Sequence, residues 1–187
     1  MPSTEVNGLV FIHIPKTAGC SITKWLTTHF NTKPTLSKCM HPSTSMINIP
    51  FDETFAVVRN PWDRTVSLWA FWNKIKKTNV SFDEFVRNIR DYKFNERLWF
   101  TLDQPQKVWI PNGVTYLLKF ETLEEDFKVI QEKLGCFEPL SHINSSEHDD
   151  YKTYYIKETW DIVADVFKDD IEEFGYTNHH LTDDSKN

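Results

Sequence analysis

The chain has 187 residues, of which 40% are hydrophobic and 14% aromatic, and its formal net charge is -6. This length suits one domain with a sizeable core, and the composition argues against disorder. The negative charge argues against a general affinity for nucleic acid, although a local basic patch could still bind an anion. We therefore expect a single domain over 1–187, with its core over about 9–176 and a polar tail over 177–187.

The cysteines and the N-terminal residues bear on metal content and location. Cys20, Cys39 and Cys136 are widely spaced, and none has a cysteine or histidine partner at the spacing of a zinc site. The first residues lack the basic and then apolar order of a signal peptide, and no window approaches ~18 consecutive apolar residues. We expect a soluble, cytoplasmic protein without a metal or a membrane span.

The first half of the chain predicts two strand–helix pairs. Residues 9–14 form a short apolar run typical of a buried parallel strand, and a helix is predicted over 17–30. The segment 31–50 is rich in Pro, Ser, Thr and Asn and predicts an irregular connection. A second buried strand over 54–59 leads into a helix over 61–77, whose first residue is a proline that costs little there.

The second half continues the alternation. Helices over 81–89 and 122–134 each open with a capping-box pattern, and Gly135 is expected to end the second of them. A third strand is predicted over 115–120, and a last amphipathic helix over 155–174. Strands that alternate with helices predict an α/β fold with a central parallel sheet flanked by helices.

The junction of the first strand and helix, IPKTAGCS (14–21), contains a lysine, hydroxyl residues and a glycine but no acidic residue. The first N–H groups of a helix, and its dipole, favour an anion. Lys16 adds a mobile positive charge, Thr17 and Ser21 offer hydroxyl groups, and Gly19 lets the backbone approach a ligand. Because Lys16 precedes Gly19, the loop has no Walker A spacing. The pattern predicts a phosphate or sulfate site; a plain turn with a solvated lysine is the alternative.

A second strand–helix junction, AVVRNPWDRTVS (56–67), has a similar character. Arg59 stands at the end of the strand, and Ser67 lies about two turns into the helix. Arg59 can bind a phosphate by two hydrogen bonds, to which Ser67 can add a hydroxyl. Ligands of open α/β sheets lie at the carboxyl ends of strands, so we expect both junctions to open onto one edge. The alternatives are an Arg59–Asp63 ion pair and a Ser67 bonded to its own backbone.

HIPKTAGCS followed by VVRNPWDRTVS resembles the two nucleotide-binding motifs of sulfotransferases that use 3′-phosphoadenosine 5′-phosphosulfate (PAPS). Among them the chain is most similar to the carbohydrate, Golgi-type, family 2-like branch. The likeness continues through YLLKFETLEEDFKVIQEKLG, HINSS and DDIEEFGY, roughly over residues 10–176. It implies a three-layer, P-loop-NTPase-like fold and transfer of a sulfuryl group to an acceptor hydroxyl, without a metal. The nearest branch indicates a carbohydrate acceptor, and a small hydroxylated metabolite or a tyrosine is the alternative.

The resemblance also implies which residues bind the donor. The 5′-phosphosulfate end would contact the first motif, at Lys16, Thr17, Ala18, Gly19, Cys20 and Ser21. The 3′-phosphate would contact Arg59 and Ser67. The segment HINSSEHDDYK resembles a loop that closes over the nucleotide, with Asn144, Ser145 and Lys152 as candidate contacts, although a polar surface loop is equally consistent. Cys20 stands where relatives often have threonine, so one hydroxyl contact is expected to be missing.

Two catalytic residues are predicted. By the resemblance, Lys16 stabilises the bridging oxygen as the S–O bond breaks. His41 is the predicted general base, because relatives often place a histidine in a comparable loop and its unperturbed pKa of ~6.5 suits the task. An ordinary surface histidine is the alternative, and Asp52 and Glu53 are weaker candidates. His13, directly before the loop, is interpreted as structural or as orienting the loop.

Two other classes of protein stay open as alternatives. A P-loop nucleotide or small-molecule kinase would keep this fold, but it needs a Walker A lysine and an acidic Mg²⁺ ligand after a strand, and neither is evident. A non-catalytic relative that only binds the nucleotide would be favoured by loss of Lys16 or Arg59, and both are present. The expected partner is a hydroxylated sulfate acceptor and not a nucleic acid.

Overall fold

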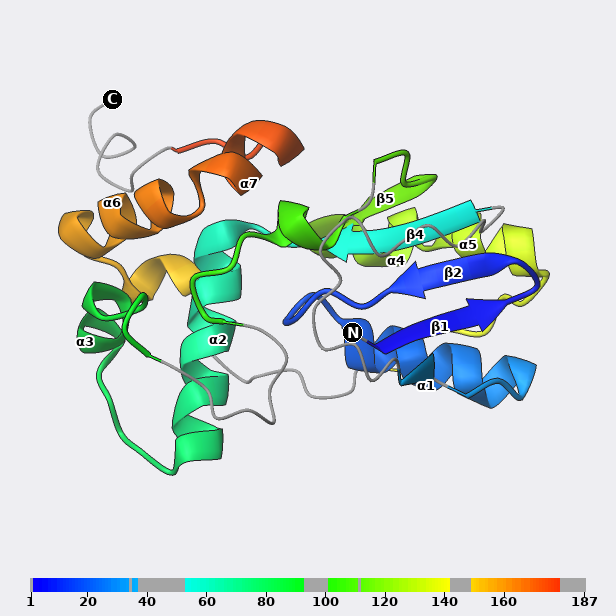
Figure 1. Cartoon of the computed structure of the whole chain (residues 1–187), viewed down its shortest axis with the longest axis horizontal. Coiled ribbons are helices and arrows are strands. Elements are labelled where there is room, and N and C mark those ends of the chain that lie inside the picture. The colour runs from blue at the N-terminus through cyan, green and yellow to red at the C-terminus, as the bar shows by residue number, and fades with distance from the viewer. Residues whose placement is uncertain are drawn as a thin grey trace. The chain divides into compact units, whose positions relative to one another are not determined.

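The computed structural model describes residues 2–33, 35–36, 53–92, 101–110, 112–141 and 149–178. The chain divides into two units, each built from two separate segments of the sequence. Unit 1 comprises residues 1–59 and 108–145, and unit 2 comprises residues 60–107 and 146–187. The described strands all belong to unit 1, whereas unit 2 is helical where it is described (Figure 1).

Unit 1 is organised by a five-stranded sheet in the order β3-β1-β2-β4-β5. The strands are β1 (Pro2–Val6), β2 (Leu9–Ile12), β3 (Thr35–Leu36), β4 (Glu53–Val58) and β5 (Tyr116–Lys119). β4 pairs in parallel with both β2 and β5, whereas β1 pairs antiparallel with β2 and β3. The three predicted strands are therefore confirmed as neighbours in a parallel core, but the sheet as a whole is mixed.

The hairpin of β1 and β2 was not predicted, although the sequence contains a signal for it. Val6 pairs with Leu9, which leaves Asn7 and Gly8 as a two-residue turn. Both have positive φ angles, 52° and 81°, as a type I′ turn requires. Asn-Gly is the commonest dipeptide of such turns, so the turn itself identifies the antiparallel strand before β2.

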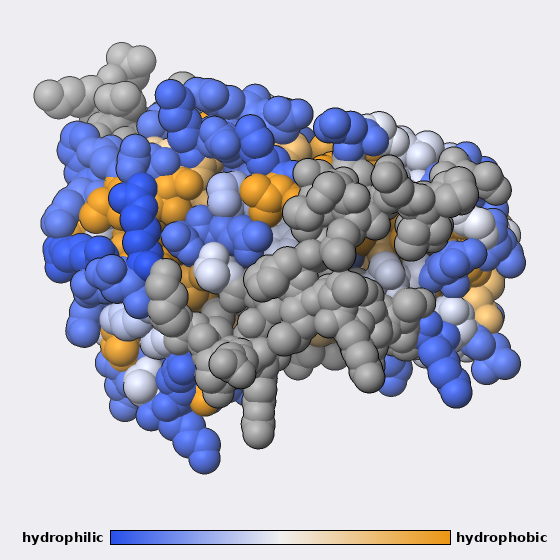
Figure 2. Space-filling model, viewed as in Figure 1, coloured by the Kyte–Doolittle hydropathy of each residue, from blue (hydrophilic) through white to orange (hydrophobic). Residues whose placement is uncertain are grey.

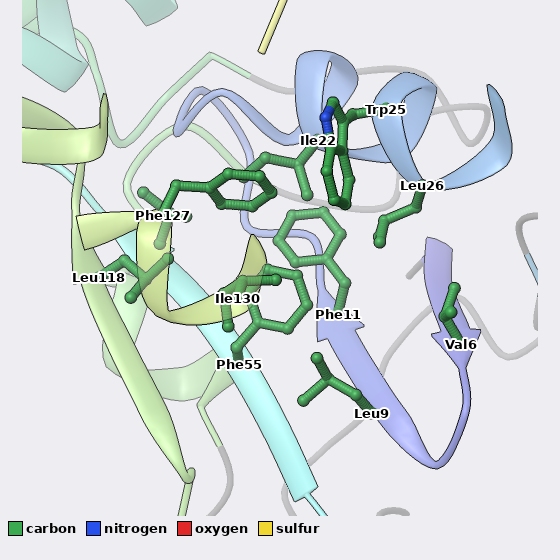
Figure 3. Packing of buried hydrophobic residues seen from close by; sticks show 11 residues of the cluster. Val6, Leu9, Phe11, Ile22, Trp25, Leu26, Phe55, Leu118, Phe127 and Ile130 are labelled. Carbon is green, nitrogen blue, oxygen red and sulfur yellow. The ribbon is translucent and has the colours of Figure 1, made fainter. Parts of the chain in front are cut away.

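One face of the sheet packs against helices of unit 1: α1 (Gly19–Phe30), α4 (Leu123–Asp126) and α5 (Lys128–Leu134). Phe11 of β2 and Phe55 of β4 meet with ring centroids 4.8 Å apart. Trp25 of α1 meets Phe127, which follows α4, edge to face at 5.0 Å. Figure 3 shows these rings gathered in one cluster. This core fixes the positions of β2 and α1, and so of the loop between them.

The helices of unit 2 are α2 (Pro61–Lys76), α3 (Phe82–Arg87), α6 (Lys157–Val166) and α7 (Lys168–Phe174). α2 begins as predicted, with the Asn60 side chain accepting hydrogen bonds from the N–H groups of Trp62 and Asp63. The capping residue predicted for α3 is also confirmed, because Ser81 Oγ accepts from the Glu84 N–H at 3.3 Å. Both helices therefore form where their local signals predict.

Two predicted helices are interrupted. The helix expected over 122–134 is divided into α4 and α5 at Phe127, and Thr122 makes no side-chain cap, contrary to the capping-box prediction. The helix expected over 155–174 begins at Lys157 and is divided at Phe167. Each phenylalanine keeps its backbone bonds to the fourth residue on either side and is buried, at 1% and 0% exposure. The breaks are thus local distortions of the backbone that leave these helical hydrogen bonds intact.

Candidate functional site

The loop between β2 and α1 is the first part of the candidate site and lies within unit 1. Lys16 and Ala18 take positive φ angles of 69° and 63°. This left-handed conformation is rare for residues with a side chain and costs about 1–2 kcal/mol each. A left-handed residue followed by a right-handed one, as at Ala18 and Gly19, is typical of the N–H concavities that bind anions. The predicted anion loop therefore has a suitable and strained backbone.

The N-terminus of α1 adds to this preference for an anion. Ala18 occupies the N-cap position without a side-chain cap, and the first turn contains no acidic residue. Ile22 N–H donates to Ala18 O at 3.2 Å, which is the first bond of the helix. The N–H groups before it, from Gly19 to Ser21, are those for which a helix offers no internal partner. They lie beside Lys16, so partial and full positive charges gather in one loop.

The three predicted hydroxyl and thiol contacts of the loop differ in accessibility. Thr17 is fully buried, and its Oγ1 donates to the carbonyl oxygen of Ile14 at 3.0 Å. A ligand would compete with this bond for the hydroxyl proton, and a donor contact by Thr17 stays a prediction. Cys20 is exposed in the first turn of α1, and Ser21 is buried at 8% exposure.

Gly19 is required by the close approach of His13. A Cβ atom built on Gly19 would lie 1.9 Å from Cδ2 and 2.1 Å from Nε2 of His13. The imidazole also stacks on Phe11, with ring centroids 5.9 Å apart. Any larger residue at position 19 would displace the ring or the start of α1. This geometry agrees with the interpretation of His13 as a residue that orients the loop.

The environment of His13 keeps its imidazole neutral. Burial, together with nearby positive charge that includes Lys16, lowers the pKa of His13 from 6.5 to about 4. A charged imidazole would lie in the same loop as the Lys16 ammonium group, so the neutral form avoids repulsion there. At neutral pH His13 therefore contributes shape rather than charge.

Arg59 joins the second motif to this loop within unit 1. It follows β4 directly, is only 6% exposed, and its Nη1 donates to the carbonyl oxygen of Lys16 at 3.2 Å. Its guanidinium carbon lies 4.0 Å from the centroid of the Phe120 ring, which follows β5. One guanidinium thus connects residues at the carboxyl ends of β2, β4 and β5. The structure brings Lys16 and Arg59 together, and Phe120 is a member of this group that the motifs did not identify.

Two of the residues predicted to contact the sulfuryl donor, Ser67 and Lys152, belong to unit 2. Ser67 lies in α2 and is buried at 3% exposure. Lys152 lies in a short 3₁₀ helix, Tyr151–Tyr154, where its side chain is exposed and its N–H donates to Asp150 Oδ1 at 3.1 Å. Their contribution to the site stays a prediction.

Of the residues predicted for acid–base chemistry and loop closure, most lie outside the part of the chain that the structure describes. His41, Asn144 and Ser145 lie outside the described residues, as does Asp52. Glu53 opens β4, at the opposite end of the strand from Arg59, and its carboxylate pairs with Lys133 Nζ at 2.5 Å. Glu53 therefore does not face the loop and is a poor candidate for the general base.

A buried polar cluster in unit 2 was not predicted. Asp170 is fully buried and accepts hydrogen bonds from the N–H groups of Gln106 at 2.7 Å and Lys107 at 3.0 Å. Burial raises the pKa of Asp170, although the charge of Arg64 and these hydrogen bonds oppose the rise. Arg64 is also buried and donates to Gln104 O at 3.2 Å. These bonds hold the segment 104–107 in place, which is a structural task.

Other features of the described residues bear on the kind of chemistry. Among them, no group of three or more His, Cys, Asp or Glu side chains could hold a metal ion. No helix that the structure describes is both long and apolar enough to cross a membrane. Hydrophilic residues predominate over the coloured part of the face in Figure 2.

Comparison with known proteins identifies the family. The sequence model described as Sulfotransferase family matches residues 3–177, which include both motifs and both units. An uncharacterized protein of Archaeoglobus fulgidus is 31% identical over 100 residues, which cover 52% of this chain and 81% of that protein. No solved structure matches. Because the family match extends over most of the sequence, the chain belongs to the sulfotransferase family, of the family 2 type.

Proposed function

We propose that the chain transfers a sulfuryl group from 3′-phosphoadenosine 5′-phosphosulfate to a hydroxyl group, and that the acceptor is a carbohydrate. The observation that carries the proposal is the β2–α1 loop. This loop contains two left-handed residues, Lys16 and Ala18, and leads into a helix without a side-chain cap. The guanidinium of Arg59 donates a hydrogen bond to its Lys16 carbonyl oxygen. The order β2–loop–α1 in a parallel core also supports the P-loop-NTPase-like, three-layer architecture that the resemblance implies. The carbohydrate acceptor rests on the resemblance to one branch of the family.

The loop suits the phosphosulfate end of this donor. The group is anionic, with oxygen atoms that accept hydrogen bonds from several directions. N–H groups at the start of α1 and the ammonium group of Lys16 are complementary to it. The absence of acidic residues from the first turn removes the charge that would repel it.

The proposed step is an in-line displacement at sulfur. The acceptor oxygen forms a bond to sulfur while the bond from sulfur to the bridging oxygen breaks, and the electron pair stays on the phosphate of the leaving nucleotide. Lys16 and the loop N–H groups stabilise that growing charge; a single lost donor of this kind typically costs ~10²–10³ in rate. His41 is proposed to take the proton of the acceptor hydroxyl.

Arg59 is proposed to bind the 3′-phosphate of the donor as well as to support the loop. Its planar guanidinium group forms paired hydrogen bonds with phosphate oxygens, which suits this role. Ser67, Asn144, Ser145 and Lys152 are carried over from the resemblance as further contacts.

A transfer assay tests the proposal. The protein is incubated with donor carrying a labelled sulfuryl group and a panel of unsulfated glycans, and labelled product is separated. Lys16→Met is expected to lower kcat by ~10²-fold or more. Lys24→Met, on the exposed side of α1, is the matched control and should keep the wild-type rate. Transfer by Lys16→Met at the wild-type rate, or phosphoryl transfer from ATP with Mg²⁺ instead, would contradict the proposal.

A further inference from the structure

The residues that follow β4 and β5 lie side by side. Val58 pairs with Lys119 in the parallel register, so Arg59 and Phe120 leave adjacent strands at the same level. The guanidinium of Arg59 lies over the Phe120 ring, 4.0 Å from its centroid. A flat cation over an aromatic face is a favourable arrangement, most of all where water is excluded, and Arg59 is 6% exposed.

The position of Phe120 is itself fixed by the backbone around it. It opens the 3₁₀ helix Phe120–Thr122, and its carbonyl oxygen accepts from the N–H of Leu123. The N–H of the preceding residue, Lys119, donates to Asp126 Oδ2 at 2.8 Å. The half-buried ring also packs against the core of unit 1. Phe120 is therefore a rigid support for a long and flexible side chain.

Arg59 needs such a support, because an unrestrained arginine side chain samples many rotamers. The bond from Nη1 to the Lys16 carbonyl requires one of these arrangements. The acceptor belongs to a residue in a left-handed conformation, so the hydrogen bond also holds a strained peptide. Loss of the ring would remove one of the contacts that hold the guanidinium against this carbonyl oxygen.

We infer that Phe120 is a positioning residue for the anion loop, whose ring holds the Arg59 guanidinium against the carbonyl oxygen of Lys16. Its expected effect on donor binding rests on the function proposed above. In this role Phe120 acts through Arg59 and not on the reacting atoms. This coupling distinguishes it from a side chain that only fills the core.

The first readout needs no ligand. The ¹³C shift of the Lys16 carbonyl reports its hydrogen bond, and it is measured by NMR in wild type, Phe120→Leu, Arg59→Ala and the double variant. The shift is expected to move in the same direction in both single variants and no further in the double variant. Phe120→Tyr keeps an aromatic face and should restore the wild-type value. An unchanged Lys16 shift in Phe120→Leu would overturn the inference.

The second readout is the affinity for 3′-phosphoadenosine 5′-phosphate, measured by calorimetry. Phe120→Leu is expected to weaken binding roughly 3- to 10-fold, in line with the strength of such contacts. In the Arg59→Ala background the same change should cost nothing more. Phe30→Leu is the matched control, because Phe30 packs on the same core at the far end of α1; it should leave the affinity unchanged.

The possible outcomes distinguish failure of the inference about Phe120 from failure of the proposed function. Equal losses from Phe120→Leu with and without Arg59 would show that the ring acts independently of the guanidinium and would overturn the inference. Failure of the wild type to bind the bisphosphate would instead count against the proposed function. The carbonyl shifts would then still decide whether Phe120 positions Arg59.

Discussion

The Nη1 atom of Arg59 donates a hydrogen bond to the carbonyl oxygen of Lys16 over 3.2 Å, although the two residues are 43 positions apart in the sequence. Arg59 belongs to the second of two motifs and Lys16 to the first. Within unit 1 the two motifs therefore meet through the backbone of the loop. A change at Arg59 is expected to alter the loop as well as any phosphate that the side chain binds.

Gly19→Ala should destabilise the protein, because the new Cβ would overlap the ring of His13. Without such overlap alanine would be the better residue in a helix by about 1 kcal/mol, so the sign of the change is informative. We expect a loss of about 1–3 kcal/mol in the free energy of unfolding, measured with urea. The double variant His13→Ala/Gly19→Ala should be more stable than Gly19→Ala alone. A Gly19→Ala protein as stable as wild type would contradict the close packing.

The stability of the protein should fall as the pH drops from about 6.5 to about 4, in part through His13. In this window the unfolded chain binds a proton at His13 that the folded chain does not, so acid favours unfolding. The contribution is up to about 3 kcal/mol at pH 4, from the shift in pKa. His13→Gln should flatten the pH dependence of urea unfolding, whereas His29→Gln, at an exposed position of α1, should not. If the free energy of unfolding fell with pH equally in wild type and His13→Gln, His13 would not be a source of the acid sensitivity.

Thr17→Val should weaken the loop by removing the bond from Oγ1 to Ile14 O. The carbonyl oxygen then loses a buried partner, and we expect a cost of about 1–3 kcal/mol in unfolding free energy. Thr17→Ser keeps the hydroxyl and is the control, with a smaller loss from the missing methyl group. If valine were tolerated better than serine at this position, packing rather than the hydrogen bond would hold the turn.

Asp170→Ala should be among the more destabilising changes in unit 2. It leaves the buried N–H groups of Gln106 and Lys107 without their acceptor, at a cost of about 2–4 kcal/mol. Asp165→Ala is the comparison, because that side chain is 74% exposed and pairs with Arg90 at the surface. Its loss should stay within about 0.5 kcal/mol. Similar urea midpoints for the two variants would argue against a structural role for the cluster.

Elements with strong local signals were predicted from the sequence. The apolar runs of β2 and β4, the proline at the start of α2 and the serine before α3 each act over a few residues. The interruptions at Phe127 and Phe167 were not predicted, because the sequence around each of them contains no local signal that ends a helix. β1 was not predicted, although the Asn7-Gly8 turn before β2 is a local signal for an antiparallel strand.

In the candidate site too, features with a local sequence signal were predicted, and features that depend on tertiary contacts were not. The loop was predicted from residue types over 14–21, and its left-handed residues and uncapped helix start are compatible with that prediction. The supports of the loop depend on contacts that no local pattern encodes: Arg59 on Phe120, and His13 on Gly19. Arg59 was identified through its motif, but its bond to Lys16 follows from the parallel pairing of β2 with β4.

The most direct test of the account is a calorimetric titration with 3′-phosphoadenosine 5′-phosphate, beside ATP with Mg²⁺, on wild type and Arg59→Ala. Arg87→Ala, which removes an exposed arginine paired with Glu158 in unit 2, is the control. We predict tight binding of the bisphosphate by wild type and Arg87→Ala, a large but still measurable loss of affinity in Arg59→Ala, and much weaker binding of ATP. Preference for ATP, or equal affinity in Arg59→Ala, would contradict the proposed donor site and favour a kinase-like enzyme instead.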